Sequence, residues 1–302
     1  MKNEKKLNAC VNLLSSRHRC LPSCLKSLWN NWNYRYDYPV YVHYFDDIYD
    51  SEEYREYIWE IVSKNIHFKS IPYKTPSFLK EEELFYNRKD IQYVRESFPI
   101  QRKGYLHMSN YFNNLYGYSN TEFEKYDYIL SVDDESLFLK EVPYDFFEVL
   151  SKKDDMAGAI KVTHSHIKPP RQGNFDCRVN LWNFLKEYMN KYNIEPKSKF
   201  IKDLLTDPEA DINFHNFTYA DSYVFKTALF KTPEWVQWNK EVNDSGGVYK
   251  YRWGDHILNN LFFLIHYGKS VYDFKTVDEG YHDQGGLRHL QNYAPGVKDL
   301  FR

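Results

Sequence analysis

Three consecutive acids, Asp133, Asp134 and Glu135, directly follow the apolar run Tyr128 to Val132. An aromatic and β-branched run of this length is typical of a buried strand. Adjacent carboxylates at the end of such a strand need a positive charge nearby, and a hard divalent cation such as Mn²⁺ or Mg²⁺ takes carboxylate oxygens as ligands. The pattern therefore favours a metal site. The alternative is a solvated acidic turn, because short acidic clusters also arise by chance.

Two basic residues follow other predicted strands. Arg17 comes after the first strand of the chain, and His282 comes after the last one, in a glycine-rich segment. Ligands of open α/β sheets bind at the carboxyl ends of the strands. Arg17 is therefore a candidate for contact with a nucleotide phosphate or base, and His282 can complete a Mn²⁺ site with two carboxylates. A solvated arginine and a hydrogen-bonded loop histidine are the alternatives.

Asp221 and Tyr223 lie two positions apart in a late predicted strand. Side chains at this spacing share one face of a strand, so both can point into one cleft. A carboxylate there can stabilise an oxocarbenium-like centre or act as a nucleophile, although a strand-edge aspartate is the alternative. Asp255, at the start of a predicted helix, joins Arg17, Asp133 and Asp134 as a candidate for contact with a nucleotide sugar, and a simple N-cap is its alternative.

The elements that must position these residues alternate in type through the first part of the chain. Strand patterns over residues 7–14, 39–45 and 66–71 are separated by helix patterns over residues 21–32 and after the N-cap Ser51. This order predicts a parallel, Rossmann-like sheet. The later patterns are strands over 128–132, 155–162, 217–225 and 271–277, and helices over 102–116, 142–150, 180–192, 233–243 and 255–265. Residues 163–215 are predicted to be loop apart from the helix over 180–192, and Gly246-Gly247 predicts a turn.

Length and composition limit the classes of protein that fit. The 302 residues suit one large α/β domain or two small ones, and 42% hydrophobic residues suffice for a core. Aromatic residues make up 19%, with 28 Tyr, which favours half-buried, wet surfaces such as sugar sites. A net charge of −2 without a basic run gives no support to nucleic-acid binding.

The chain also resembles the fungal α-1,2-mannosyltransferases of glycosyltransferase family 15. The resemblance is collinear and includes Arg102-Lys103-Gly104-Tyr105 and Tyr251-Arg252-Trp253-Gly254-Asp255. It covers most of the chain except residues 157–215. The matching stretches are residues 44–47, 49–58, 71–73, 81–88, 102–108, 115–118, 121–128, 251–255 and 280–282.

The resemblance implies a single α/β domain of the GT-A fold over residues 1–302, with a mixed, mainly parallel sheet between helices. Residues 1–135 would form the nucleotide-sugar-binding half and residues 136–302 the acceptor-binding half. The implied reaction transfers mannose from GDP-mannose to a hydroxyl of a glycan or glycoprotein, with retention and with Mn²⁺. Asp133 and Glu135 take the positions of the outer acids in the family's Glu-Pro-Asp triplet, His282 matches its metal-ligand histidine, and Tyr105 matches an active-site tyrosine.

One departure from the family bears on the chemistry. Tyr223 stands where the family has its proposed nucleophilic glutamate, and Asp221 is the nearest carboxylate on the same predicted strand face. Two alternatives follow: a transferase of the same fold with another sugar nucleotide and inversion, with a carboxylate as general base, or a catalytically silent glycan-binding protein. Retained metal ligands argue against the silent protein.

The sequence contains no apolar stretch that could span a bilayer, and residues 1–6 are not followed by the apolar core of a signal peptide. We therefore expect a soluble, cytoplasmic chain as printed, and the Asn-, Lys- and Tyr-rich composition suggests a viral or bacterial source. The Golgi lumen, where the family's fungal members reside, would require a membrane anchor that has been removed.

Overall fold

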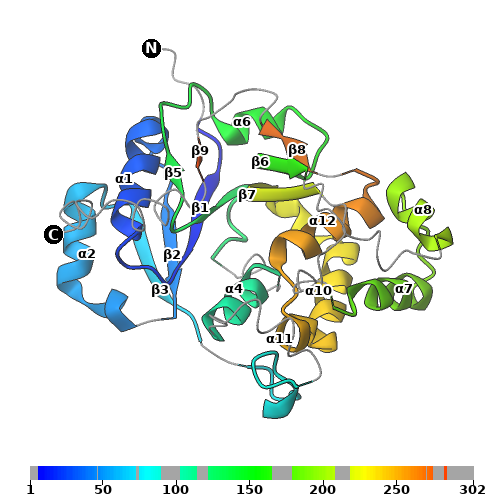
Figure 1. The fold of residues 1–302 in the computed structure, drawn as a ribbon. Helices are drawn as coiled ribbons and strands as arrows, with labels where there is room; N and C mark the ends of the chain where they lie inside the picture. The colour runs from blue at the N-terminus through cyan, green and yellow to red at the C-terminus, as the bar shows by residue number, and fades with distance from the viewer. Residues whose placement is uncertain are drawn as a thin grey trace.

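The computed structural model describes residues 6–45, 47–72, 75–89, 103–113, 122–164, 179–207, 218–269, 271–274 and 282–283. A seven-stranded sheet runs through the middle of the molecule in the order β3-β2-β1-β4-β7-β6-β8 (Figure 1). Its strands are β1 (Ala9–Ser15), β2 (Val40–Tyr44), β3 (Ile66–Ser70), β4 (Tyr128–Asp133), β6 (Ala157–His164), β7 (Thr218–Lys226) and β8 (Tyr272–Asp273).

The first four strands of the order confirm the predicted parallel sheet. β1 pairs in parallel with both β2 and β4, and β2 pairs in parallel with β3. β7 is antiparallel to its neighbours β4 and β6, whereas β6 and β8 are parallel. The sheet is therefore mixed and mainly parallel, as expected.

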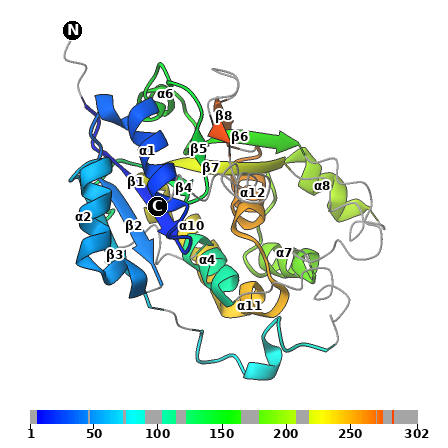
Figure 2. The same cartoon turned by 60° about the vertical axis from the view of Figure 1, so that its left-hand side comes forward.

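Helices cover both faces of the sheet (Figures 1 and 2). On one face lie α1 (Leu21–Asn31), α2 (Glu52–Ile61) and α6 (Phe146–Ser151). The other face carries α4 (Lys103–Asn113), α7 (Leu181–Lys191), α8 (Lys199–Thr206), α10 (Pro233–Ser245), α11 (Gly247–Tyr251) and α12 (Asp255–His266). Short 3₁₀ turns are η1 (Asn33–Arg35), η2 (Asp47–Asp50), η3 (Glu81–Glu83) and η4 (Thr227–Lys231).

Alternating strand residues divide between two apolar cores. Ile129 of β4 packs in the core under α4, α10 and α12, whereas its neighbour Leu130 packs in the core under α1 and α6. This alternation follows from the two-residue period of a strand. It assigns every residue of β4 to one face or the other, which matters for the acids at its end.

Several elements differ from the sequence prediction. α8 is a helix within a region expected to be mostly loop, since eight residues are too few for helical periodicity to stand out. α11 begins at Gly247, where two successive glycines predicted a turn. The helix expected over 142–150 begins at Phe146, because Asp145 caps it by accepting a bond from the Phe147 amide.

A second, two-stranded sheet lies beyond the end of β4. β5 (Leu137–Phe138) pairs antiparallel with β9 (His282–Asp283), with Phe138 opposite His282. The prediction placed His282 in a loop after the last strand. The backbone bonds of β5 instead hold it in a short strand close to the acidic triplet.

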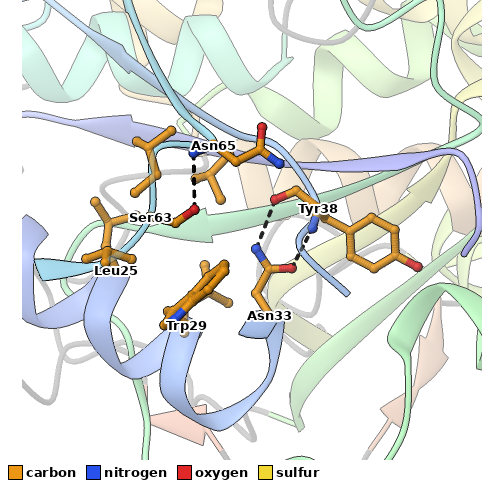
Figure 3. A pocket seen from close by; sticks show the side chains of 10 residues that line it. Leu25, Trp29, Asn33, Tyr38, Ser63 and Asn65 are labelled. Carbon is orange, nitrogen blue, oxygen red and sulfur yellow. Dashed lines mark hydrogen bonds between the residues drawn. The ribbon is translucent and has the colours of Figure 1, made fainter. Parts of the chain in front are cut away.

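A small hollow lies where β2 and β3 begin, at the opposite end of these strands from the residues that follow them (Figure 3). Its cavity volume is about 10 Å³, which suits a single water. The polar groups of its wall bond to the chain itself: Asn33 to both the amide and the carbonyl of Tyr38, and Ser63 to the Asn65 amide. The hollow is therefore not a substrate site.

Candidate active site

The middle acid of the triplet, Asp134, is completely buried. Its Oδ2 accepts hydrogen bonds from the Ser15 hydroxyl at 2.9 Å, the Ser16 amide at 2.9 Å and the Arg17 amide at 2.8 Å. Its Oδ1 accepts a bond from the Arg17 guanidinium. Asp134 therefore anchors the loop that follows β1. Its two oxygens face this loop, so any contribution to nucleotide binding would act through Arg17.

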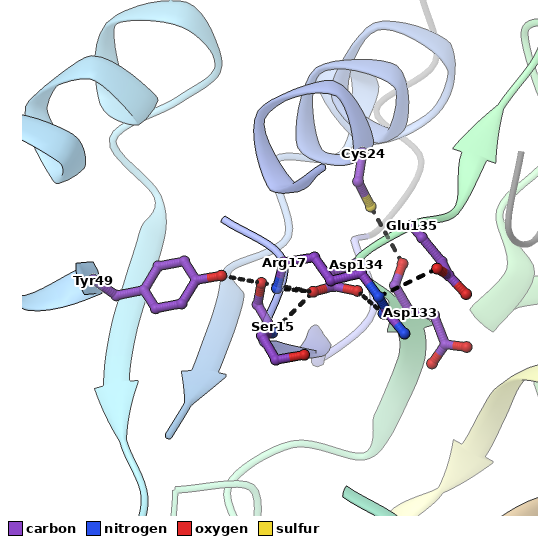
Figure 4. A network of polar contacts seen from close by, with 8 residues as sticks. Ser15, Arg17, Cys24, Tyr49, Asp133, Asp134 and Glu135 are labelled. Atoms are coloured by element: carbon purple, nitrogen blue, oxygen red, sulfur yellow. Dashed lines mark hydrogen bonds and ion pairs between the residues drawn. The ribbon is translucent and has the colours of Figure 1, made fainter. Parts of the chain in front are cut away.

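Arg17 joins two acids of the triplet (Figure 4). Its Nη1 is paired with Asp134, and its Nε lies 3.3 Å from Oε2 of Glu135. The Arg17 side chain is 42% exposed, whereas that of Glu135 is only 5% exposed. Burial alone would lower the pKa of Arg17, but the charges of Asp134 and Glu135 outweigh it and raise that pKa above its ordinary value. Arg17 is thus permanently charged and has an accessible edge.

The anchored loop is tied to the 3₁₀ turn η2, which is itself bonded to α2. The Tyr49 hydroxyl lies 2.7 Å from the Ser15 hydroxyl, and both groups are buried. Nε of Arg55, on α2, donates to the Tyr49 carbonyl at 2.6 Å. On the side of α1, the Cys24 thiol lies 3.5 Å from the Asp133 carbonyl (Figure 4). Neighbours on both sides therefore fix the backbone around the triplet.

Asp133 is the last residue of β4 and is partly exposed. By the strand period it lies on the face of Ile129 and Ser131, which is the face covered by α4 and α12. Glu135, two positions later, is buried beside Arg17. The two outer acids of the triplet therefore differ in surroundings: one faces the helices, and the other is paired with an arginine.

The segment before α12 forms a second group of polar residues on the same face. The Arg252 guanidinium carbon lies 4.0 Å from the centre of the Tyr105 ring, a cation–π contact between this segment and α4. Arg252 has a left-handed backbone with φ of 60°. A side chain at Gly254 would come within 3.6 Å of the Tyr105 hydroxyl, so Tyr105 lies directly against the motif that leads to Asp255.

Asp255 is buried at the first position of α12, and Gly254 is the N-cap. The prediction that Asp255 caps the helix was off by one residue, because the extended Gly254 takes that position. Oδ2 of Asp255 lies 3.7 Å from Nε2 of His256. An acid in the first turn is also favoured by the helix dipole.

Tyr223 is 3% exposed, with its ring between those of Phe225 and His256. The centroids are 5.2 Å and 5.8 Å away, at interplanar angles of 13° and 20°. Its hydroxyl donates a long bond of 3.4 Å to the His256 carbonyl. These contacts make Tyr223 a packed part of the wall between β7 and α12.

The residue of β7 that precedes Tyr223 has an unusual backbone conformation. Ser222 has φ of 50°, a left-handed conformation that is rare for a residue other than glycine. Within β7, the residues that pair with β4 are Val224 to Lys226, so Ser222 lies outside that pairing. β7 nevertheless pairs with β6 in the same register on both sides of Ser222, with Ala159 opposite Tyr223 and Lys161 opposite Asp221, so the shared face of Asp221 and Tyr223 stays a prediction. The side chain of Asp221 lies outside the described residues.

The side chain of His282 also lies outside the described residues, but its backbone is placed. Phe138, its partner in β5, is three positions beyond Glu135. Pairing of β5 with β9 therefore carries His282 toward Asp133 and Glu135. Among the side chains that the structure describes, no cluster of three His, Cys, Asp or Glu residues has the arrangement of a metal site.

Sequence reasoning found the triplet and Arg17 but missed the residues that fix them. Ser15 and Tyr49 carried no signal, since a serine after a strand and a tyrosine in a polar turn are common in loops. His256 was also missed, although it directly follows the predicted Asp255. Its position in the first turn of a predicted helix, directly after the motif that ends at Asp255, is the only signal available.

No helix in the ranges described above has the length and apolarity of a membrane span. A curated relative, the probable mannosyltransferase KTR4 of Saccharomyces cerevisiae, is 20% identical over 277 residues. The match covers 86% of this chain and 56% of the relative, so the chain spans little more than half of that protein's length.

Two solved structures share the fold. Core-mannan synthase A (CmsA/Ktr4) from Aspergillus fumigatus, in its Mn/GDP form, superposes with a TM-score of 0.68 at 16% identity, covering 89% of this chain and 72% of that one. Ktr4p from S. cerevisiae, in complex with GDP, gives a TM-score of 0.69 at 16% identity, covering 92% and 71%. The predicted GT-A fold is confirmed. Because the family model for glycolipid 2-alpha-mannosyltransferases matches residues 1–285, this chain belongs to that family, glycosyltransferase family 15.

Proposed function

We propose that this chain is a metal-dependent mannosyltransferase that moves mannose from GDP-mannose to a hydroxyl of a glycan or glycoprotein, forming an α-1,2 linkage with retention. The observation that carries the proposal is the acidic end of β4 with the anchored Arg17 beside it, in a chain whose family match spans residues 1–285. GDP in two structures of the same fold, and Mn in one of them, support the choice of donor and cation.

The residues present fit a divalent cation. Asp133 and Glu135 offer hard carboxylate oxygens two positions apart, and Glu135 is a buried carboxylate whose charge needs a positive partner. In the proposal these two acids and His282 hold Mn²⁺ or Mg²⁺. When bound, the cation supplies Lewis-acid stabilisation of the diphosphate leaving group.

The other residues bind and orient the substrates. Arg17 contacts the diphosphate with its exposed edge and is held in place by Asp134. Asp255 binds the nucleotide sugar, and Tyr105, packed against Arg252 and Gly254, orients the donor. Asp221 faces the anomeric carbon and stabilises positive charge there or forms the covalent intermediate that retention requires. The packed ring of Tyr223 borders this region.

A second candidate, favoured by the burial of a phenol at position 223, is a transferase of the same fold with another sugar nucleotide and inversion of configuration. In that reaction a carboxylate takes the proton of the acceptor hydroxyl as general base. A glycan-binding protein without activity has less support, because the acids and Arg17 have little use without a diphosphate.

A donor panel tests the proposal. GDP-mannose, GDP-fucose and UDP-sugars are each incubated with the protein and a simple mannoside, in Mn²⁺ and then in EDTA. Nucleotide release is followed, and the product anomer is read by NMR. The expected result is Mn²⁺-dependent release from GDP-mannose with an α-linked product. A β-linked product or a different donor would establish the second candidate, and release from no donor would favour the silent binding protein.

A matched pair of variants locates the site. Asp133→Ala is expected to lower the rate by at least about 100-fold, the scale of losing one electrostatic contact to a transition state. Asp154→Ala, which removes an exposed acid elsewhere, should leave the rate unchanged. Full metal-dependent activity in Asp133→Ala would show that the triplet is not the metal site.

A further inference from the structure

Arg17 is attached to two acids, Asp134 and Glu135, and the two attachments differ. Toward Asp134 it is bound by both its backbone amide and its guanidinium, and Ser15 and Ser16 reinforce that anchor. Toward Glu135 its Nε makes a longer contact of 3.3 Å. The first attachment has several hydrogen bonds on a carboxylate without solvent exposure, so the second is the one that can be exchanged.

Glu135 needs the positive charge that Arg17 provides. Its side chain is only 5% exposed, and an uncompensated buried carboxylate costs several kcal/mol. A divalent cation on Glu135 would supply the same compensation with a higher charge. Two cationic groups at one buried carboxylate repel each other, because the low local dielectric strengthens their interaction. The cation and Nε of Arg17 therefore compete for Glu135.

We propose that Arg17 is a built-in counter-ion that competes with the divalent cation for Glu135 and, once displaced, binds the donor's diphosphate while Asp134 keeps it at the site. This inference rests on the proposed function, since it requires the cation on Glu135. The proposal makes cation binding and nucleotide binding reinforce each other. The cation displaces Arg17 from Glu135 and leaves it available to the diphosphate, and a bound diphosphate draws Arg17 away and leaves Glu135 available to the cation. The two effects on affinity are equal by linkage.

Calorimetric titration of Mn²⁺ alone, without nucleotide, tests the competition. Arg17→Ala should bind Mn²⁺ about tenfold more tightly than the wild type, within the usual range of such couplings. Arg19→Ala is the matched control, because it removes the same charge from an exposed position of the same loop, and it should bind like the wild type. Thermal unfolding of all three proteins confirms that they are folded.

Titration of GDP at saturating Mn²⁺ tests the second half of the proposal. Arg17→Ala should bind GDP at least about tenfold more weakly, as expected for the loss of a hydrogen bond to a charged group. GDP should strengthen Mn²⁺ binding in the wild type and in Arg19→Ala, and much less in Arg17→Ala. Asp134→Asn, which weakens the anchor, should also lose GDP affinity, and adding it to Arg17→Ala should change that affinity by less than twofold.

Each remaining outcome overturns a stated part. Mn²⁺ binding by Arg17→Ala that is equal to or weaker than that of the wild type would make Arg17 an ordinary phosphate ligand or a structural support, and the competition would be excluded. Unchanged GDP affinity in Arg17→Ala would exclude the diphosphate contact. A wild type that binds GDP but no Mn²⁺ would overturn the metal site of the proposed function itself, which is distinguishable from both.

Discussion

At the scale of the residue, the position expected for a nucleophile holds a ring that the structure uses for packing. Tyr223 lies between Phe225 and His256 and is nearly inaccessible. Its hydroxyl donates a long bond, 3.4 Å, to the His256 carbonyl. A hydrogen bond of that length contributes little, whereas the ring stacks on Phe225 and His256, so we expect the ring to matter more than this bond.

Tyr223→Phe is therefore expected to retain at least about one third of the activity and to lose less than about 1 kcal/mol of unfolding free energy. Tyr223→Ala removes the ring and should cost about 3–5 kcal/mol, as large-to-small aromatic changes in cores do. Steady-state kinetics and urea unfolding give the two quantities. A 100-fold loss of activity in a stably folded Tyr223→Phe would assign the hydroxyl a direct part in the reaction.

Three adjacent acids could be identified from the sequence, but their division of labour could not. Asp134 is buried because Ser15, Ser16 and Arg17 supply its donors, and these lie 117 to 119 positions away in the chain. A local sequence pattern cannot identify a hydrogen-bond donor that is so distant in the chain. The sequence therefore predicted an acidic site at the end of a strand, whereas the anchor on Asp134 emerged only when the strands were paired.

At the scale of the element, α11 shows why a pair of glycines need not be a turn. Gly246 has the left-handed backbone that a turn pattern expects, with φ of 67°. Gly247 instead starts a helix and lies flat on the indole of Trp253, where a Cβ would come within 2.1 Å of the ring. Trp253 is buried, and its Nε1 donates to the Val179 carbonyl at 2.8 Å.

Gly247→Ala is therefore expected to lower the unfolding free energy by at least about 2 kcal/mol, because the indole has no room to withdraw. It should also reduce activity, since a displaced Trp253 moves Arg252 and Asp255 with it. Gly104→Ala in α4 is the matched control, where nothing lies within 4 Å of the added methyl group. That change should raise stability by about 0.5–1 kcal/mol. Equal effects of the two substitutions in urea unfolding would contradict this account.

Helices and strands could be predicted from the sequence wherever a long periodic pattern existed, whereas irregular backbone conformations could not. The strands that become β1, β2 and β3 and the helices between them were predicted because period and caps agree. The left-handed Ser222 within β7 has no sequence signal, since serine favours no such conformation. The pairing of β7 with β6 keeps its register across this residue, so the strand was predicted and only the local conformation of Ser222 was not.

At the scale of the whole molecule, pairing brings together segments that no local pattern relates. β7 inserts between β4 and β6, and β9 reaches back to β5, so the sheet order does not follow the chain order. The resemblance to the family implied a mixed, mainly parallel sheet without this strand order, whereas the periodicity of the sequence alone predicted only the parallel first part. The division into a nucleotide-sugar-binding half, residues 1–135, and an acceptor-binding half, residues 136–302, remains a prediction. The two halves are joined in one sheet, because β4 of the first pairs with β7 of the second.

Two buried histidines in different parts of the molecule are held neutral by the fold. His43 of β2 is 1% exposed; its Nδ1 lies 3.0 Å from the Asn12 side chain, and Glu122 and Lys69 are the charged groups facing it. Burial lowers the pKa of His43 to about 4, against an opposing effect of Glu122. His266 of α12, bonded to the Tyr188 hydroxyl at 2.9 Å, has its pKa lowered by burial to about 4 as well.

These lowered pKa values predict acid sensitivity in a defined window. The unfolded chain takes up these protons near pH 6.5 and the folded chain only near pH 4, so stability is intact above about pH 6.5 and falls between the two values. Each histidine contributes at most about 3 kcal/mol to that fall. His43→Gln, which cannot be protonated, should therefore lose about 2 kcal/mol less than the wild type between pH 7 and 4.5 in urea unfolding. Carboxylates titrate equally in both proteins and cancel in the comparison, so identical losses would mean that His43 is already protonated in the folded protein.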